Sequence, residues 1–166
     1  MVFDRGLSWG DINGFKGFFP EVFTRNNALT ARCPHKPDRE QFNAFVTDAL
    51  LNKRAIGLNV FDVAGPKTGN HAMTAWGVEY DEAGDIAYIY YCDNNFAEQD
   101  PNGAVLIRQQ VVYAVDDYGK ECTYLQQLKP EAPDTRVGRF LITSVFSADL
   151  GRDIWKKKYP DVVVEK

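Results

Sequence analysis

His71 and Asp93 are the two residues whose types and spacing best suit catalysis. Each lies in one of two alternating segments joined by a short turn, His71 near the start of the first and Asp93 at the end of the second. If Tyr80 pairs with Gly84 across that turn, His71 lies directly opposite Asp93, with Cβ atoms ~4.5–5.5 Å apart. A carboxylate at that distance fixes the tautomer of an imidazole and stabilises its charged form. A bulge at Gly84 would shift this register by one residue.

The three cysteines are poor candidates for a nucleophile. Cys92 neighbours Asp93, so its side chain should point to the opposite face of the strand, where we expect a small core residue. Cys33 opens no helix whose N-terminus could lower its pKa, and Cys122 lies in a predicted strand. An odd, sparse set of cysteines indicates no disulfide framework and leaves one bridge possible. On these grounds alone, a structural histidine at a strand start, satisfied by Asp93, is the favoured interpretation of His71.

Other kinds of site have little support. The only other histidine is His35, and no zinc-binding spacing, phosphate-binding glycine loop or hydrolase nucleophile motif occurs, so we expect no metal and no cofactor. The acidic stretch after Asp93 lacks the glycine and glutamate positions of a calcium loop. A net charge of −4 argues against nucleic acid as a partner. No apolar run approaches the ~20 residues of a membrane span, and the first residues do not resemble a signal peptide.

The elements that must position His71 and Asp93 are one helix and about six strands. Asp38 is a plausible N-cap with Gln41 three residues later, and an apolar stripe runs from Phe42 to Leu50. Alternation and turn residues predict strands over residues 56–60, 71–80, 85–93, 105–115, 120–128 and 139–146, a connection over 129–138, and short helical segments near 11–19 and 149–158. The order predicts an α+β fold with a strongly curved or barrel-like antiparallel sheet, within a single domain over residues 1–166.

Residues 70–81 have the form N-H-x-x-x-x-W-G-x-x-x-D, and the next segment ends in I-Y-Y-C-D-N-N. These stretches resemble the His and Asp segments of the IdeS/Mac family of immunoglobulin-G-degrading cysteine endopeptidases. Weaker similarity before the helix and near residues 140–155 extends the resemblance over roughly residues 17–157. The resemblance implies that His71 is the catalytic histidine and Asp93 the residue that orients it. It also assigns supporting positions to Trp76 and Asn95. Trp76 could instead serve core or sheet packing, and Asn95 replaces an acidic residue of the family pattern.

The resemblance further implies a papain-like fold, of which this chain would be the β-rich, His/Asp-bearing lobe. The family's nucleophilic cysteine belongs to an N-terminal part that we expect to be absent from this chain. The implied function is protein cleavage by thiolate acyl transfer, with immunoglobulin G as substrate and the missing half as partner. We therefore expect the chain alone to be inactive, and the family implies a secreted or cell-surface location.

Two other functions remain open. The chain could be a non-catalytic module that binds host proteins, for which Phe15, Phe18, Phe19, Tyr88 and Tyr90 are aromatic surface candidates unless they pack in the core. It could also be a structural domain in which His71 and Asp93 serve only folding.

Overall fold

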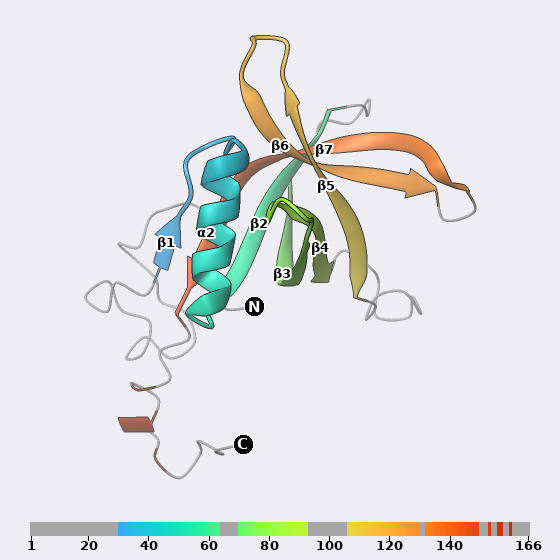
Figure 1. Ribbon diagram of the computed structural model, residues 1–166. Coiled ribbons are helices and arrows are strands. Elements are labelled where there is room, and N and C mark those ends of the chain that lie inside the picture. Colours follow the sequence, from blue (N-terminus) through green and yellow to red (C-terminus); the bar gives the residue numbers. More distant parts are fainter. Residues whose placement is uncertain are drawn as a thin grey trace.

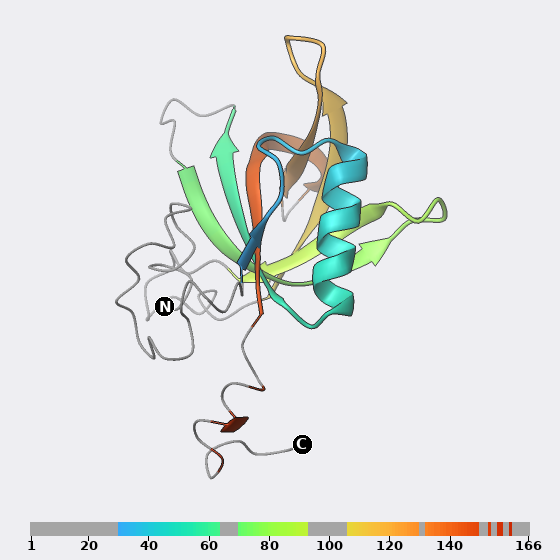
Figure 2. The same ribbon diagram turned by 90° about the vertical axis from the view of Figure 1, so that its left-hand side faces the viewer.

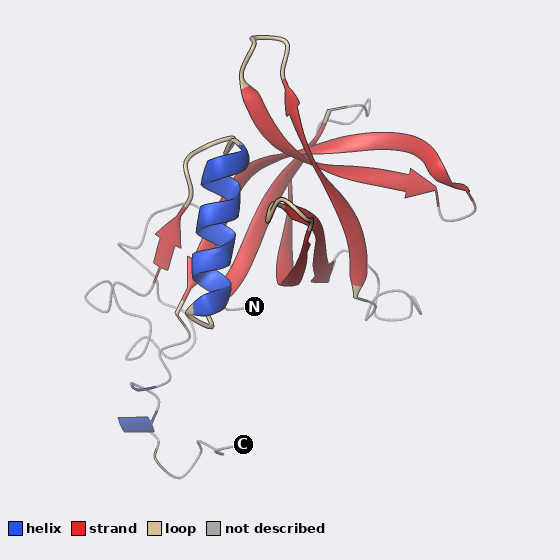
Figure 3. Cartoon of the chain, viewed as in Figure 1, coloured by secondary structure: helices blue, strands red, loops and turns tan. Residues whose placement is uncertain are grey.

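The computed structural model describes residues 30–63, 70–92, 106–129 and 132–149, and beyond them Asp153, Lys156, Lys157 and Pro160. Seven strands and one helix make up this part of the chain (Figures 1 and 3). In chain order they are β1 (Thr30–Arg32), α2 (Arg39–Leu51), β2 (Ala55–Asp62), β3 (Asn70–Tyr80), β4 (Ile86–Cys92), β5 (Ile107–Val115), β6 (Glu121–Lys129) and β7 (Ala132–Ala148).

The sheet closes on itself, because β7 pairs both with β2 and with β6. All pairings are antiparallel, and the order β7-β2-β3-β4-β5-β6 returns to β7, with β1 added beside the second half of β7. The predicted papain-like α+β lobe with a curved antiparallel sheet is therefore wrong: the fold is a closed six-stranded antiparallel β-barrel with one helix. The error has a physical source, since part of the predicted connection over 129–138 is strand and supplies the β6–β7 pairing that closes the barrel.

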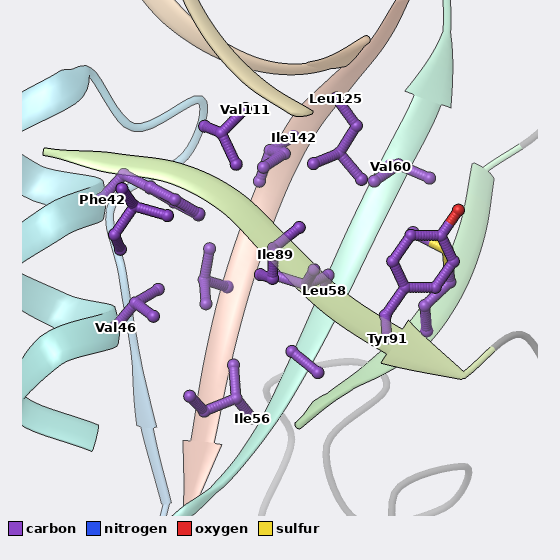
Figure 4. Packing of buried hydrophobic residues seen from close by; sticks show 14 of the residues in the cluster. Phe42, Val46, Ile56, Leu58, Val60, Ile89, Tyr91, Val111, Leu125 and Ile142 are labelled. Carbon is purple, nitrogen blue, oxygen red and sulfur yellow. The ribbon is translucent and has the colours of Figure 1, made fainter. Parts of the chain in front are cut away.

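Helix α2 confirms the predicted start signal. The Asp38 carboxylate accepts a hydrogen bond from the Gln41 amide, and the Gln41 side chain accepts one from the Asp38 amide, which satisfies two backbone donors at the helix start. Phe42, Val46 and Ala49 lie on one helix face and are buried. They pack into the same core cluster as the inner-face residues of the barrel, so α2 covers part of the barrel interior (Figure 4).

Both hairpin turns have the same structure, although only their positions could be predicted. Asp81 and Asp116 each start a turn in which one carboxylate oxygen accepts the backbone amides two and four residues later. The fourth residue of each turn is a glycine with positive φ, Gly84 at 86° and Gly119 at 80°, a conformation that favours glycine. Each turn therefore holds five residues between the flanking strands.

Figure 2 shows that the two ends of β3 lie on different sides of the molecule. The end at Tyr80 lies beside α2, where the Tyr80 hydroxyl is 2.9 Å from the hydroxyl of Thr47. The start of β3 lies away from the helix, next to the end of β2. Since a strand rises about 3.3 Å per residue, His71 lies roughly 30 Å along the strand from Tyr80.

Candidate functional site

His71 lies on the inner face of the barrel, at the end of β3 away from α2. It pairs with Val60 of β2, and the next inner-face pairs along the same two strands are Leu58 with Met73 and Ile56 with Ala75. All five of these neighbours are buried, whereas His71 itself is partly exposed. The imidazole therefore lies at the end of an apolar row. One side of it faces the core, and it remains accessible to solvent.

The predicted register between β3 and β4 is wrong. Tyr80 pairs with Ile86 instead of Gly84, because the carboxylate of Asp81 holds a five-residue turn. Two further register shifts follow, one between Glu79 and Tyr80 and one between Ala75 and Gly77. Within the described residues, the outermost pair of this ladder on the His71 side is Thr74 with Cys92. The Tyr80–Gly84 pair from which we derived the direct opposition of His71 and Asp93 is therefore absent, and the derivation fails with it.

Asp93 and Asn95 lie outside the described residues, so their assignment stays a prediction. The described part of β4 does show which face leads toward them. Tyr91 pairs with Ala75 and is buried on the inner face, the same face that carries His71. Because side chains alternate along a strand, the residue two positions after Tyr91 would continue that face if the strand were prolonged.

Trp76 is an outer-face residue. It occupies the extra position of the bulge between Ala75 and Gly77, and 66% of its surface is exposed. The interpretation of Trp76 as a core residue is therefore wrong. A Cβ atom added at Gly77 would meet nothing within 4 Å, so the surface beside Trp76 is open.

A polar and aromatic cluster follows on the same outer face, across β3, β4 and β5. Arg108 donates two hydrogen bonds to the Glu79 carboxylate, at 2.8 and 2.6 Å, and Tyr90 donates a third. The Arg108 guanidinium also lies 3.4 Å from the centre of the Tyr88 ring. These hydrogen bonds lower the pKa of Glu79 to about 2, first through Arg108 and then through Tyr90. Sequence reasoning named Tyr88 and Tyr90 but missed their partners Glu79 and Arg108, which the pairing of β4 with β3 and β5 brings beside them.

The cysteines are all free, and two of them are unsuited to nucleophilic attack. Burial, with a smaller contribution from the Asp38 carboxylate, raises the pKa of Cys33 to about 11. Burial first, and Asp116 second, also raise the pKa of Cys122. Cys92 pairs with Thr74, on the face opposite the buried Tyr91. It is only partly buried, so its predicted place in the core is wrong, whereas its predicted orientation away from the His71 face is confirmed.

The described residues contain neither a metal-binding cluster nor a membrane-spanning helix. No group of three or more His, Cys, Asp or Glu side chains in this part of the chain is arranged to hold a metal ion. No helix among the same residues is long and apolar enough to cross a membrane. Phe15, Phe18 and Phe19 of the aromatic surface candidates, and the helical segment expected near residues 11–19, lie outside what the structure describes.

Comparison with protein families gives one match, which covers residues 9–155 and is described as Mac 1. The chain belongs to the Mac-1 family. The match includes the segments that carry His71, Trp76, Asp93 and Asn95, and it supports a function related to the IdeS/Mac cysteine proteases.

Other comparisons add little to this assignment. No curated protein matches this Mac-1 chain. Among solved structures, the chain is similar to one described as "Structure of EndoMS in apo form", with 11% identity and a TM-score of 0.30. That alignment covers 82% of this chain and 62% of the other, so the Mac-1 chain spans less than two thirds of its length. A likeness this low carries no argument about function.

Proposed function

We propose that this chain is the histidine-bearing part of an IdeS-like cysteine endopeptidase, in which His71 acts as the general base. The observation that carries the proposal is the position of His71, which ends the apolar inner row of a barrel in a Mac-1 family chain and keeps access to solvent. A base in this setting can take the proton of a thiol and later return it to the leaving amine.

The remaining parts of the proposed site come from the family resemblance. Asp93 orients the imidazole, and Asn95 and Trp76 support the site. The buried Cys33 and Cys122, both with raised pKa, favour a nucleophilic cysteine supplied by polypeptide outside these 166 residues. The proposed reaction is acyl transfer from a protein substrate to that cysteine, followed by hydrolysis, with immunoglobulin G as the substrate.

The test combines this chain with the cysteine-bearing segment of an active IdeS/Mac protease and follows cleavage of immunoglobulin G. We expect the mixture to cleave, the chain alone to be inactive, and both His71→Ala and Asp93→Ala to abolish cleavage. His35→Ala is the matched control and should leave the rate unchanged, because His35 is an exposed loop residue. Cleavage by the isolated chain that is lost on Cys33→Ala would overturn the proposal, as would full activity of the His71→Ala mixture.

A second function, a non-catalytic module that binds host proteins, is favoured by the outer face of β3–β5. Exposed Trp76 and the stacked Arg108–Tyr88 pair are of the residue types that dominate binding energy in protein interfaces. Binding of immunoglobulin G by the chain alone, lost on Trp76→Ala and kept by His71→Ala, would support this function. The absence of cleavage by every mixture would further support the binding function.

A further inference from the structure

The β-bulge beside His71 suggests how the barrel positions this residue. Asn59 of β2 pairs with Ser144 of β7, but the next residue, Val60, pairs with Ile142. Thr143 is therefore an extra residue in β7, inserted at the step where β2 passes from Asn59 to Val60. Bulges bend a strand locally and change the direction of the side chains beside them.

The bulge is held on both sides by hydrogen bonds that an ordinary ladder does not contain. The Thr143 hydroxyl donates to the Asn59 carbonyl oxygen at 3.1 Å. The Thr143 carbonyl oxygen accepts the backbone amide of Lys36 at 3.0 Å, from the loop before α2. These two contacts fix the extra residue to β2 on one side and to the loop on the other.

A single row of paired residues connects the bulge at Thr143 to His71. Ile142, Val60 and His71 are neighbours on three adjacent strands, and the first two are 0% and 2% exposed. Figure 4 shows Val60 continuing the inner-face row of β2 that contains Ile56 and Leu58. Because packed interiors leave little free space, a movement of Val60 must be accommodated by the side chain that pairs with it.

We infer that Thr143 is a positioning residue for His71. Its hydroxyl holds the bulge that fixes the position of Val60, and Val60 fixes the position of the His71 imidazole. The inference rests on the proposed function, in which His71 is the base. It deepens that function by naming a residue that touches neither substrate nor nucleophile. Neither the motif around His71 nor its spacing to Asp93 points to Thr143, which lies 72 positions later in the chain.

The test observes His71 directly by NMR. The chain has two histidines, so His35→Gln leaves one imidazole and keeps the backbone carbonyl of residue 35 that Lys120 contacts. In this background we compare Thr143→Val, which removes the hydroxyl at nearly constant volume, with Thr143→Ser, which keeps it. The control is Thr123→Val, which removes an equivalent bond from a threonine hydroxyl to the Pro37 carbonyl, at 2.9 Å, near the start of α2.

We expect Thr143→Val to change the chemical shifts of the His71 ring, and Thr143→Ser and Thr123→Val to leave them near the parent values. In the protease mixture, kcat should fall roughly tenfold or more with Thr143→Val while KM stays constant, since small misplacements of a catalytic group are costly. If Thr143→Val does not fold, Thr143→Ala removes the same donor with a smaller side chain.

An unchanged His71 spectrum in folded Thr143→Val or Thr143→Ala overturns the inference, and so does an equal change in Thr143→Ser. These outcomes do not depend on whether the proposed protease function is correct. If the His71 signals move as expected but no mixture cleaves immunoglobulin G, the positioning holds and the protease assignment fails.

Discussion

The two ends of strand β3 are built differently. At the Tyr80 end, helix α2 meets the barrel through polar contacts, including the bonds of Asn43 to β4 and β5 and the pair of hydroxyls of Thr47 and Tyr80. At the His71 end, the inner face is an apolar row of paired residues, and the bulge at Thr143 in β7 lies beside it. We therefore expect residues that stabilise the barrel to be separable from residues that position the imidazole. Changes beside α2 should affect unfolding, and changes beside the bulge should affect the imidazole.

The largest expected effect is the loss of stability in Phe42→Ala. Phe42 is fully buried where α2 meets the barrel core, so its replacement leaves a cavity and should cost roughly 3–5 kcal/mol of unfolding free energy. Urea unfolding measures this change. Val60→Ala, at the other end, removes only two methyl groups and should cost about 2 kcal/mol. A larger loss in Val60→Ala than in Phe42→Ala would contradict the proposed division between the two ends.

Asn43→Ala tests the polar contacts of the same end. The Asn43 side chain accepts the Ile86 amide at 2.6 Å and donates to the Tyr113 hydroxyl at 3.0 Å. Its removal leaves a partly buried amide without this acceptor, so we expect a loss of roughly 1–3 kcal/mol. Asn52→Ala is the control, since the exposed Asn52 side chain bonds only to Asp48 within the helix region, and it should change stability by about 0.5 kcal/mol or less. His71 ring signals should be unaffected in both variants.

Alkaline pH should reveal the buried thiol beside α2. The pKa of Cys33 is raised by burial from its ordinary value of 9.0 to about 11. Above pH 9 the unfolded chain loses this proton while the folded chain keeps it, so stability falls between pH 9 and 11. Chemical unfolding as a function of pH measures the slope, and Cys33→Val should flatten it. An identical slope in wild type and Cys33→Val would show that this thiol does not contribute.

The smallest expected effect lies on the outer face, at Glu79. Its pKa is lowered from 4.5 to about 2 by the bonds from Arg108 and Tyr90, so the stability they contribute is present above pH 4.5 and is lost as pH falls toward 2. Because the group is exposed, solvent screens the interaction and the loss should be slight. Acid unfolding of Glu79→Gln should be less steep over this range than that of wild type. Glu82→Gln, in the nearby turn, is the control and should unfold as wild type does.

Local features could be predicted from the sequence because short-range chemistry determines them. The capping box of Asp38 and Gln41 and the helix that follows are confirmed, as are strands over residues 71–80 and the turns at Gly84 and Gly119. The register within the first hairpin could not be predicted in the same way. The five-residue turn follows from the Asp81 carboxylate and is repeated at Asp116, so comparing the two turns could have revealed it.

Long-range features escaped sequence reasoning for a different reason. Closure of the barrel depends on pairing between β6 and the first half of β7, in a stretch whose prolines and charges indicated a connection. The bulge at Thr143 depends on how β2 and β7 meet, which no local pattern records. His71 was found from its residue type and its neighbours, whereas Thr143 became visible only when the strands were placed side by side.

The double role of β7 has a consequence for the way the chain folds during synthesis. Pairs such as Val60 with Ile142 join residues 82 positions apart. The barrel therefore closes only after β7 has been synthesised and has paired with β2. Contacts between residues so distant in sequence slow folding, and unpaired strand edges invite association between incomplete chains. A ribosome that stalls before Ile142 would thus leave β2 and β6 with open edges, and these nascent chains should depend on chaperones more than released ones do.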